Sequence, residues 1–159
     1  MFKKCLLISA LLIANQSFAN HIDVKMTSVD NKDLGTISFE DSHFGLLITP
    51  NLSQLPEGQH GFHIHEHADC GDHGMNAMGH LDPKHSGKHL GPYAKGHLGD
   101  LPVLVVDKDG HAKTQMLAPR LKVSDLKNHS VMIHAGSDNY SDQPKLGGGG
   151  ERIACGIVK

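Results

Sequence analysis

The chain has 159 residues, with 15 Lys and Arg, 17 Asp and Glu, 14 His and a formal net charge of -2. That length suits one domain built around a single core. Lys and Arg form no cluster that could track phosphates, only 4% of the residues are aromatic, and Trp is absent. The composition therefore argues against nucleic acid as a partner.

The amino terminus has the pattern of a secretory signal peptide. Lys3 and Lys4 precede an apolar run at residues 6–14, and a small-x-small sequence follows at 17–19. The run is shorter than the ~20 residues of a membrane-spanning helix, so no membrane span is expected. We predict a signal peptide at 1–19 and a mature domain at 20–159. Removal of both lysines leaves 13 basic residues and changes the formal charge to -4.

The cysteines predict one disulfide. Cys5 lies in the predicted signal peptide, which leaves Cys70 and Cys155 in the mature chain. In an oxidising compartment an even pair indicates a disulfide, and two buried free thiols are the alternative. Closing so long a loop restricts the unfolded chain by roughly 4 to 5 kcal/mol in the loop-entropy account.

Extended runs separated by Gly, Pro and Asp turns follow one another along the mature chain. In chain order they cover residues 22–26, 34–39, 44–49, 60–67, 102–106, 112–117, 131–135 and 153–158. No segment has convincing helical periodicity. Eight short strands predict an all-β sandwich or flattened barrel.

Two long segments interrupt this rhythm. Residues 68–101 and 136–151 are rich in Gly, His, Asp and Pro and have no periodic apolar pattern. Loops longer than about 15 residues are uncommon in compact domains unless they are functional or disordered. The first segment contains a cysteine and several histidines, so covalent and metal bonds are expected to order it.

Two of the predicted strands carry histidines in positions that suit metal binding. His63 and His65 are two residues apart and therefore share one face of a strand, while their apolar neighbours face the core. His67 has the same parity and remains a candidate. His134 ends a second strand. Three converging imidazoles would suit copper or zinc, whereas each histidine taken singly fits an exposed polar face.

The first long segment supplies a further set of ligand types: His80, His89, His97 and Asp100. Three imidazoles and one carboxylate make a closed tetrahedral set, which is how structural zinc is held. A flexible histidine-rich metal-capture segment is the alternative. The regular Gly and Pro positions favour a defined loop path.

These motifs together resemble the signature of copper/zinc superoxide dismutase. The resemblance rests on segments 61–66, 80–100 and 150–156 and on His134, and it covers essentially the whole mature chain. Segments 80–83, 99–102, 138–144 and 146–150 resemble the bacterial periplasmic branch of the family. It implies an eight-stranded antiparallel Greek-key β-sandwich or flattened barrel, a periplasmic location, and a homodimer or a monomer.

The resemblance also implies roles for individual residues. Copper would be held by His63, His65, His80 and His134, and zinc by His80, His89, His97 and Asp100. His80 would then bridge the two ions, which requires the loss of its second ring proton, and nearby dications favour that loss. Asp138 would accept hydrogen bonds from His63 and His89.

The implied activity is the dismutation of superoxide to dioxygen and hydrogen peroxide, with copper as the redox ion and His80 as the proton carrier. Arg152 would bind the anion, because its charge is permanent and its donors are forked. Taken alone, Arg152 fits an ordinary strand-edge cation. A non-enzymatic copper and zinc storage protein on the same fold is the alternative function.

The family pattern leaves eight histidines without a role. Metal capture and solvent-exposed filler are both compatible with them. They are His21, His43, His60, His67, His73, His85, His111 and His129.

Overall fold

A computed structural model describes residues 20–159 of the chain. The predicted signal peptide at 1–19 lies outside the described residues. Within 20–159 the chain forms nine β-strands and three short 3-10 helices, and it forms no α-helix there. No helix in this part of the chain is long and apolar enough to cross a membrane.

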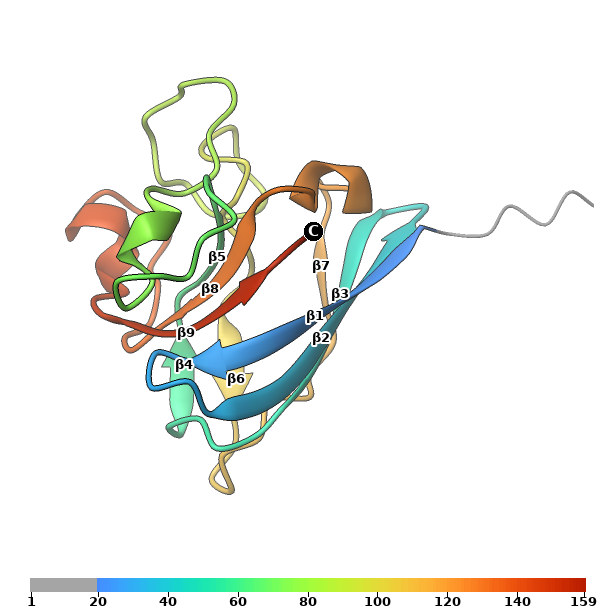
Figure 1. The fold of residues 1–159 in the computed structure, drawn as a ribbon. Coiled ribbons are helices and arrows are strands. Elements are labelled where there is room, and N and C mark those ends of the chain that lie inside the picture. Colours follow the sequence, from blue (N-terminus) through green and yellow to red (C-terminus); the bar gives the residue numbers. More distant parts are fainter. Residues whose placement is uncertain (1–19) are drawn as a thin grey trace, which may run out of the picture.

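The strands form one curled seven-stranded sheet and one two-stranded sheet (Figure 1). The order in the larger sheet is β5-β8-β9-β1-β2-β3-β7, and β4 pairs with β6. All the pairings are antiparallel. The strands are β1 (His21–Ser28), β2 (Asp33–Ser42), β3 (Gly45–Leu52), β4 (Gly58–His60), β5 (Phe62–His65), β6 (Leu104–Val106), β7 (Met116–Ala118), β8 (Ser130–His134) and β9 (Arg152–Ile157).

The topology follows the Greek-key order. Hairpins join β1, β2 and β3, and the last strand of the chain, β9, returns to lie beside β1. A strand that returns beside the first of three hairpin-connected strands is the defining step of this motif. The predicted all-β flattened barrel is confirmed.

The strand boundaries differ from the prediction most clearly at two of the expected strands. The expected strand at 60–67 is divided at Gly61 and ends at His65: β4 pairs with β6, whereas β5 pairs with β8, and the Gly61 amide donates to the Gly136 carbonyl at 2.7 Å. The expected strand at 112–117 forms only an isolated bridge between Leu52 and Ala112 before β7 begins. These differences give nine strands rather than eight.

Alternation along the strands builds the core. In β1, Val24 and Met26 are buried while the residues between and before them are more exposed, and Ile37 and Phe39 repeat the pattern in β2. Side chains two apart on a strand face the same way, so one face of each strand faces the barrel interior. Full burial of each such side chain contributes roughly 1.5–3 kcal/mol to the hydrophobic stabilisation.

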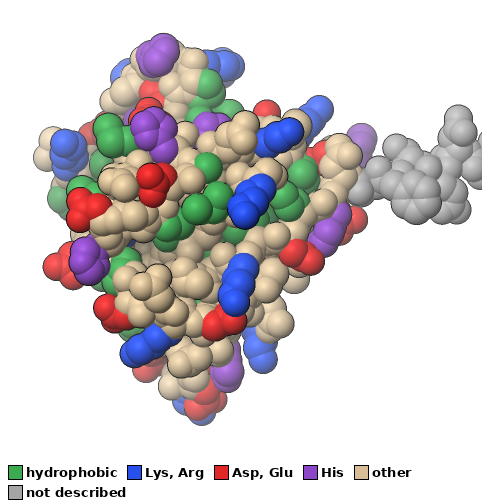
Figure 2. Space-filling view, in the orientation of Figure 1, with side chains coloured by type: hydrophobic (Ala, Val, Ile, Leu, Met, Phe, Trp, Pro, Cys, Tyr) green, Lys and Arg blue, Asp and Glu red, His purple; other side chains and the backbone are tan. Residues whose placement is uncertain are grey.

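Both long connections lie at the same end of the barrel, away from the β2–β3 hairpin (Figure 1). The first contains the 3-10 helix η1 (Met75–Ala77), and the second contains η3 (Lys145–Gly148); a third, η2 (Val123–Leu126), precedes β8. The predicted disulfide is confirmed: Cys70 and Cys155 are bonded, with their Cα atoms 5.8 Å apart, so the first loop is tied to β9. Acidic and basic side chains are intermingled on the face drawn in Figure 2.

Candidate metal centre

The strand-borne histidines come from two adjacent strands. His63 and His65 lie on β5, and β5 pairs with β8, which ends at His134. A β-bulge between Ile133 and His134 shifts the register there, so that Arg152 lies opposite His134. His134 lies two residues after Met132, the β8 partner of His63, so its side chain points to the same face as His63. All three imidazoles are buried.

The first long loop runs along the free edge of β5. Isolated bridges pair His63 with Asp100 and His65 with His80, so the two ends of the ligand-rich segment meet the strand. The Ile64 amide also donates to the Gly99 carbonyl at 2.8 Å. The loop therefore covers the free edge of β5, and all four residues of this strand are buried.

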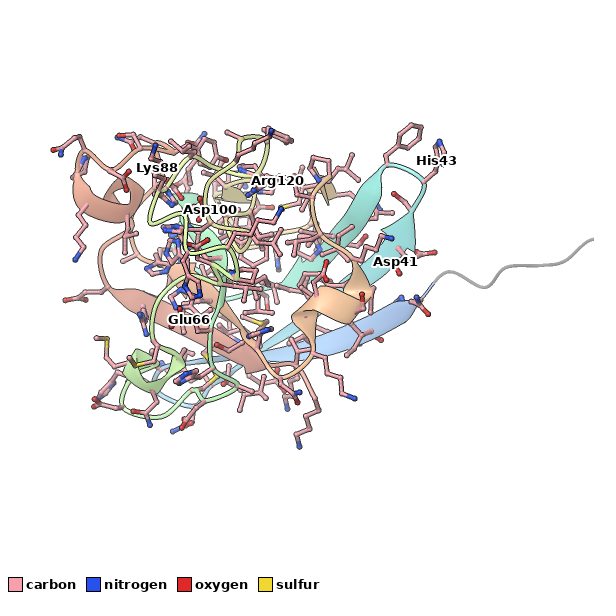
Figure 3. The ribbon with its side chains drawn as sticks, turned by 90° about the horizontal axis from the view of Figure 1, so that it is seen from above. Asp41, His43, Glu66, Lys88, Asp100 and Arg120 are labelled. Carbon is pink, nitrogen blue, oxygen red and sulfur yellow. A yellow bond between two sulfur atoms is a disulfide. The ribbon has the colours of Figure 1, made fainter. Side chains whose placement is uncertain are left out.

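The structure brings the predicted ligands into one cluster that contains two overlapping groups. Within each group the candidate ligand atoms all lie within 4.8 Å of one another. The first group is His63, His65, His80 and His134, and the second is His63, His80, His89 and Asp100. Figure 3 shows Asp100 among the loop segments, with Arg120 close to it.

Unpaired ring nitrogens in the cluster fit a metal. Within the cluster, five buried ring nitrogens have no hydrogen-bond partner in the described part of the chain: Nδ1 of His63, His89 and His97, and Nε2 of His65 and His134. The opposite nitrogen is engaged in several of these rings: His65 Nδ1 contacts the Met78 carbonyl at 2.9 Å, and His134 Nδ1 contacts the Gly150 carbonyl at 3.2 Å. A buried unpaired nitrogen is costly unless a ligand occupies it.

The loop half of the cluster is arranged around one carboxylate oxygen. Asp100 Oδ1 lies 2.9, 3.0 and 3.4 Å from the Nδ1 atoms of His80, His89 and His97. Tetrahedral zinc with ligand bonds of about 2.0–2.1 Å places its ligands about 3.3 Å apart. The spacing therefore fits a zinc site. His97 is not a member of the second group, but the 3.4 Å between its Nδ1 and Asp100 Oδ1 fits a fourth ligand of this zinc site.

His63 and His80 are common to both groups, but only one of them can serve two ions. His63 Nε2 is held by Asp138 Oδ2 at 2.7 Å, which leaves Nδ1 as its single free nitrogen. His80 Nδ1 faces Asp100, and no hydrogen bond within residues 20–159 engages its Nε2. His80 is therefore the ring with a nitrogen available on each side.

Asp138 connects the two halves. Its Oδ2 accepts from His63 Nε2 and its Oδ1 accepts from His89 Nε2, both at 2.7 Å. The Tyr140 amide also donates to Oδ1 at 2.7 Å. A carboxylate in this position fixes the tautomer and the orientation of both rings. These are the contacts that the family resemblance implied for Asp138.

The electrostatics of the two halves differ. Burial lowers the pKa of His63 to about 3 and that of His134 to about 4, and it lowers the pKa of His65 as well. Burial also acts against protonation of His89, but the nearby carboxylates of Asp100 and Asp138 raise its pKa to about 9. At neutral pH the three histidines on β5 and β8, which we call the strand half of the cluster, are therefore uncharged before any metal binds.

Arg152 lines a cleft over the strand half. The cleft has a volume of about 280 Å³, and its lining includes His65, His80, His134 and Lys145. The Arg152 guanidinium donates to the carbonyl oxygens of Gly74 and Met78, which fixes it beside the first loop. A cation and histidine nitrogens at one cleft suit a small anion.

Sequence analysis did not identify the residues that order the loop half of the cluster. Arg120 donates from three nitrogens to four backbone carbonyls of the loop, those of Gly91, Pro92, Gly96 and His97. Between β7 and β8, an isolated arginine has no sequence signal that separates it from a surface cation.

Further support comes from the second loop. The His89 amide donates to Asp142 Oδ1 at 3.2 Å, and the Tyr140 hydroxyl accepts from the Val103 amide at 2.8 Å. These contacts join the second long loop to the first. Neither position stands out from the sequence, because each is an ordinary polar residue in a turn-rich segment.

Seven of the eight remaining histidines lie outside the cluster on exposed or half-buried positions, including His67, which shares the strand parity of the ligands. The eighth, His60, is buried. Its ring nitrogens lie 2.8 and 2.9 Å from the carbonyl oxygens of His134 and Pro56, so it supports the backbone at His134.

A Greek-key barrel with an imidazole shared between two ligand sets defines a metalloprotein with a paired metal site. The family model described as copper/zinc superoxide dismutase matches residues 34–158. A superoxide dismutase [Cu-Zn] of Legionella pneumophila is 51% identical over 156 residues, which are 97% of this chain and 96% of the relative.

Comparison with solved structures gives the same family. The Cu/Zn superoxide dismutase from Brucella abortus has a TM-score of 0.83 and 40% identity, with 88% of this chain and 100% of that chain covered. The monomeric copper, zinc superoxide dismutase from Salmonella enterica has a TM-score of 0.76 and 47% identity over the same shares. The chain belongs to the copper/zinc superoxide dismutase family.

Proposed function

We propose that the histidine cluster holds one copper ion and one zinc ion and that the protein dismutates superoxide to dioxygen and hydrogen peroxide. The observation that carries this proposal is the set of buried, unpaired ring nitrogens that converge beside a cleft lined by Arg152. Membership of the family identifies the reaction, and the arrangement of the histidines and Arg152 in this chain is compatible with it.

Copper would be held by His63, His65, His80 and His134. Imidazole nitrogen is a ligand that copper accepts, and the three strand-borne rings are neutral because burial lowers their pKa. Zinc would be held by His80, His89, His97 and Asp100, whose spacing suits a closed tetrahedral site. His80 would be shared, through Nδ1 on the zinc side and Nε2 on the copper side.

Bound copper supplies the one-electron chemistry that oxidises one superoxide and reduces the next, whereas zinc has no redox states. The chain's own contribution is binding and proton handling. Arg152 holds the anion in the cleft through its permanent charge. His80 Nε2, when it is not bound to copper, would take up a proton and give it to the second superoxide as that anion is reduced, and water would supply the second proton of hydrogen peroxide. Nδ1 of the ring, which faces Asp100, would stay on the zinc side and keep the ring in place.

A storage protein would need ligands but no anion-binding residue over them. In this chain the lining of the cleft combines three candidate copper ligands with Arg152 and Lys145. This combination favours the enzyme over the storage alternative.

The test uses the mature protein at 20–159 loaded with zinc. Superoxide decay is measured by stopped flow while copper is added in sub-stoichiometric steps. We expect the rate to rise linearly and to stop rising at one copper per chain. A rate that stays at the level of the copper-free protein at full occupancy would overturn the proposed activity.

The shared ring has a separate test. With copper loaded into both halves, two ions on one imidazole should be magnetically coupled, and electron paramagnetic resonance should show the coupling. A His80→Ala variant removes the shared ring and should show two uncoupled signals. Uncoupled signals from the unaltered protein would contradict the role of His80.

We also propose export to the periplasm. The support is the sequence pattern at 1–19 together with the Cys70–Cys155 disulfide, a bond typical of oxidising compartments. Fractionation of a bacterial host followed by amino-terminal sequencing should find the protein in the periplasm with Asn20 first. The remaining assembly alternatives, monomer and homodimer, are separated by sedimentation velocity of the metal-loaded protein.

A further inference from the structure

Two exposed methionines stand immediately before His80 in the first long loop. Met75 and Met78 are 57% and 52% exposed, and they are the only exposed methionines in residues 20–159. Single exposed apolar residues are ordinary. Here two thioethers three residues apart follow His73, another exposed side chain, and the family site uses none of the three.

One hydrogen-bonded turn holds the two methionines close together. Met75 opens the 3-10 helix η1, and Met78 follows the helix at φ 62, with its amide donating to the Met75 carbonyl at 3.1 Å. The Cα atoms at the two ends of such a turn lie within about 7 Å of each other. Methionine has three rotatable side-chain bonds, so both sulfurs can reach one ion above the turn.

The turn itself is fixed, although its methionine side chains face solvent. Asn76 donates from its side chain to Asp69 at 3.3 Å, which ties the start of the loop to the helix. Arg152 donates to the carbonyl oxygens of Gly74 and Met78, one on each side of η1. A fixed backbone with free thioethers is a preorganised ligand arrangement.

The methionine turn abuts the strand half of the cluster. The Met78 carbonyl contacts His65 Nδ1 at 2.9 Å, and the Glu66 amide donates to the Gly79 carbonyl at 3.0 Å. The backbone of Met78 is therefore in direct contact with a proposed copper ligand. An ion held by the two thioethers would lie on the outer side of that contact.

Thioether sulfur is a soft ligand that selects copper(I), while zinc prefers thiolate, imidazole and carboxylate. We propose that Met75, Met78 and His73 form a second metal site, specific for copper(I), that takes the ion from solution and passes it to the histidine cluster. The ion moves as copper(I) throughout, so no electron is transferred. Only the passing-on rests on the proposed function; the binding of copper(I) at the methionines does not.

The test of binding uses the protein already loaded with one copper and one zinc. Copper(I) is presented as its bicinchoninate complex under nitrogen, and the fraction withdrawn from the dye is followed by absorbance. The unaltered protein should withdraw one further equivalent per chain. A Met75→Leu, Met78→Leu double variant keeps side-chain volume and should withdraw none.

Two control variants isolate the site. Met116→Leu removes a half-buried thioether on β7, and it should leave the extra equivalent in place. His43→Ala, at the far hairpin tip shown in Figure 3, should also leave it in place, whereas His73→Ala should weaken it. No extra equivalent in the unaltered protein, or an undiminished one in the double variant, would overturn the site.

Delivery is tested on copper-free, zinc-loaded protein mixed with the same complex. The double variant should fill the histidine cluster roughly tenfold more slowly, because it lacks the locally concentrated ion. Its final copper content and its dismutation rate at full loading should match those of the unaltered protein. Equal filling rates would overturn delivery alone. A fully loaded but inactive unaltered protein would instead contradict the proposed function and leave the methionine site standing.

Discussion

The two halves of the metal centre are built in different ways. The copper half takes three of its four proposed ligands from adjacent, hydrogen-bonded strands, so backbone pairing already positions the rings. The zinc half takes all of its proposed ligands from the first loop, where side chains supply the order: Arg120 from the turn after β7, and Asp138 and Asp142 from the second loop.

The halves also differ before metal binds. The strand-borne histidines are neutral because burial lowers their pKa, whereas Asp100 and Asp138 raise the pKa of His89 to about 9. A site on a sheet is thus prepared by the fold, while a site on a loop depends on a few polar ties and on the ion itself. Each of the following experiments alters one of these differences.

The largest expected effect comes from the covalent tie, which belongs to the copper side. A Cys70→Ser, Cys155→Ser double variant should lower the free energy of unfolding by about 2–5 kcal/mol, because the unfolded chain loses its cross-link. Guanidinium denaturation of the metal-loaded protein measures it. Hydrogen exchange should quicken around η1 more than at residues 89–97. A change below about 1 kcal/mol would show that the loop is held without the disulfide.

Removal of the anion-binding residue should separate catalysis from metal binding. Arg152→Ala should slow dismutation roughly 10- to 100-fold, the loss expected for a hydrogen bond to a charged group. Copper and zinc contents should stay at one each. Lys122→Ala, an exposed cation beside η2, serves as the control and should leave the rate unchanged. An unchanged rate in Arg152→Ala contradicts the assigned role.

Asp138→Asn tests the connection between the halves. An asparagine keeps the shape but has one acceptor oxygen, so it can accept from only one of the two rings. We expect metal affinity to fall about 10- to 100-fold, more for zinc than for copper, because β5 still holds His63. Competition with chelators measures both dissociation constants. Asp125→Asn in η2 is the matched control, and equal losses for both metals would refute the contrast between the halves.

Arg120→Lys should have the smallest effect and should act on zinc alone. Lysine keeps the charge but lacks the fork that reaches four carbonyls, so the segment 91–97 should loosen. Zinc should dissociate roughly three- to thirtyfold faster, a range that corresponds to the loss of one or two hydrogen bonds. Copper release from the same samples is the internal control. Faster copper release to the same extent would indicate general destabilisation.

Much of this molecule could be predicted where local rules act. Period-two alternation identified β1, β2, β5 and β8, and the parity of His63 and His65 placed them together. The two loops were recognisable because they lack any periodic pattern. The assignment of ligands to two ions came from family resemblance, since spacing alone left His67 open and offered no order for the loop.

The rest depends on contacts between distant segments. The bulge before His134 changes which residue faces Arg152, and no local pattern marks it. The division at Gly61 arises because β4 pairs with β6 and β5 pairs with β8, strands that lie far along the chain. Arg120 holds a segment more than twenty residues away. Such ties depend on the tertiary path, which sequence periodicity does not encode.

The single carboxylate of Asp138 serves one ring on each side of the centre. Occupancy on either side orders that carboxylate for the other, so the two binding equilibria are thermodynamically linked. Reciprocity then requires that whatever factor zinc contributes to copper affinity, copper contributes to zinc affinity. A cell that supplies the two metals in either order would arrive at the same final partition.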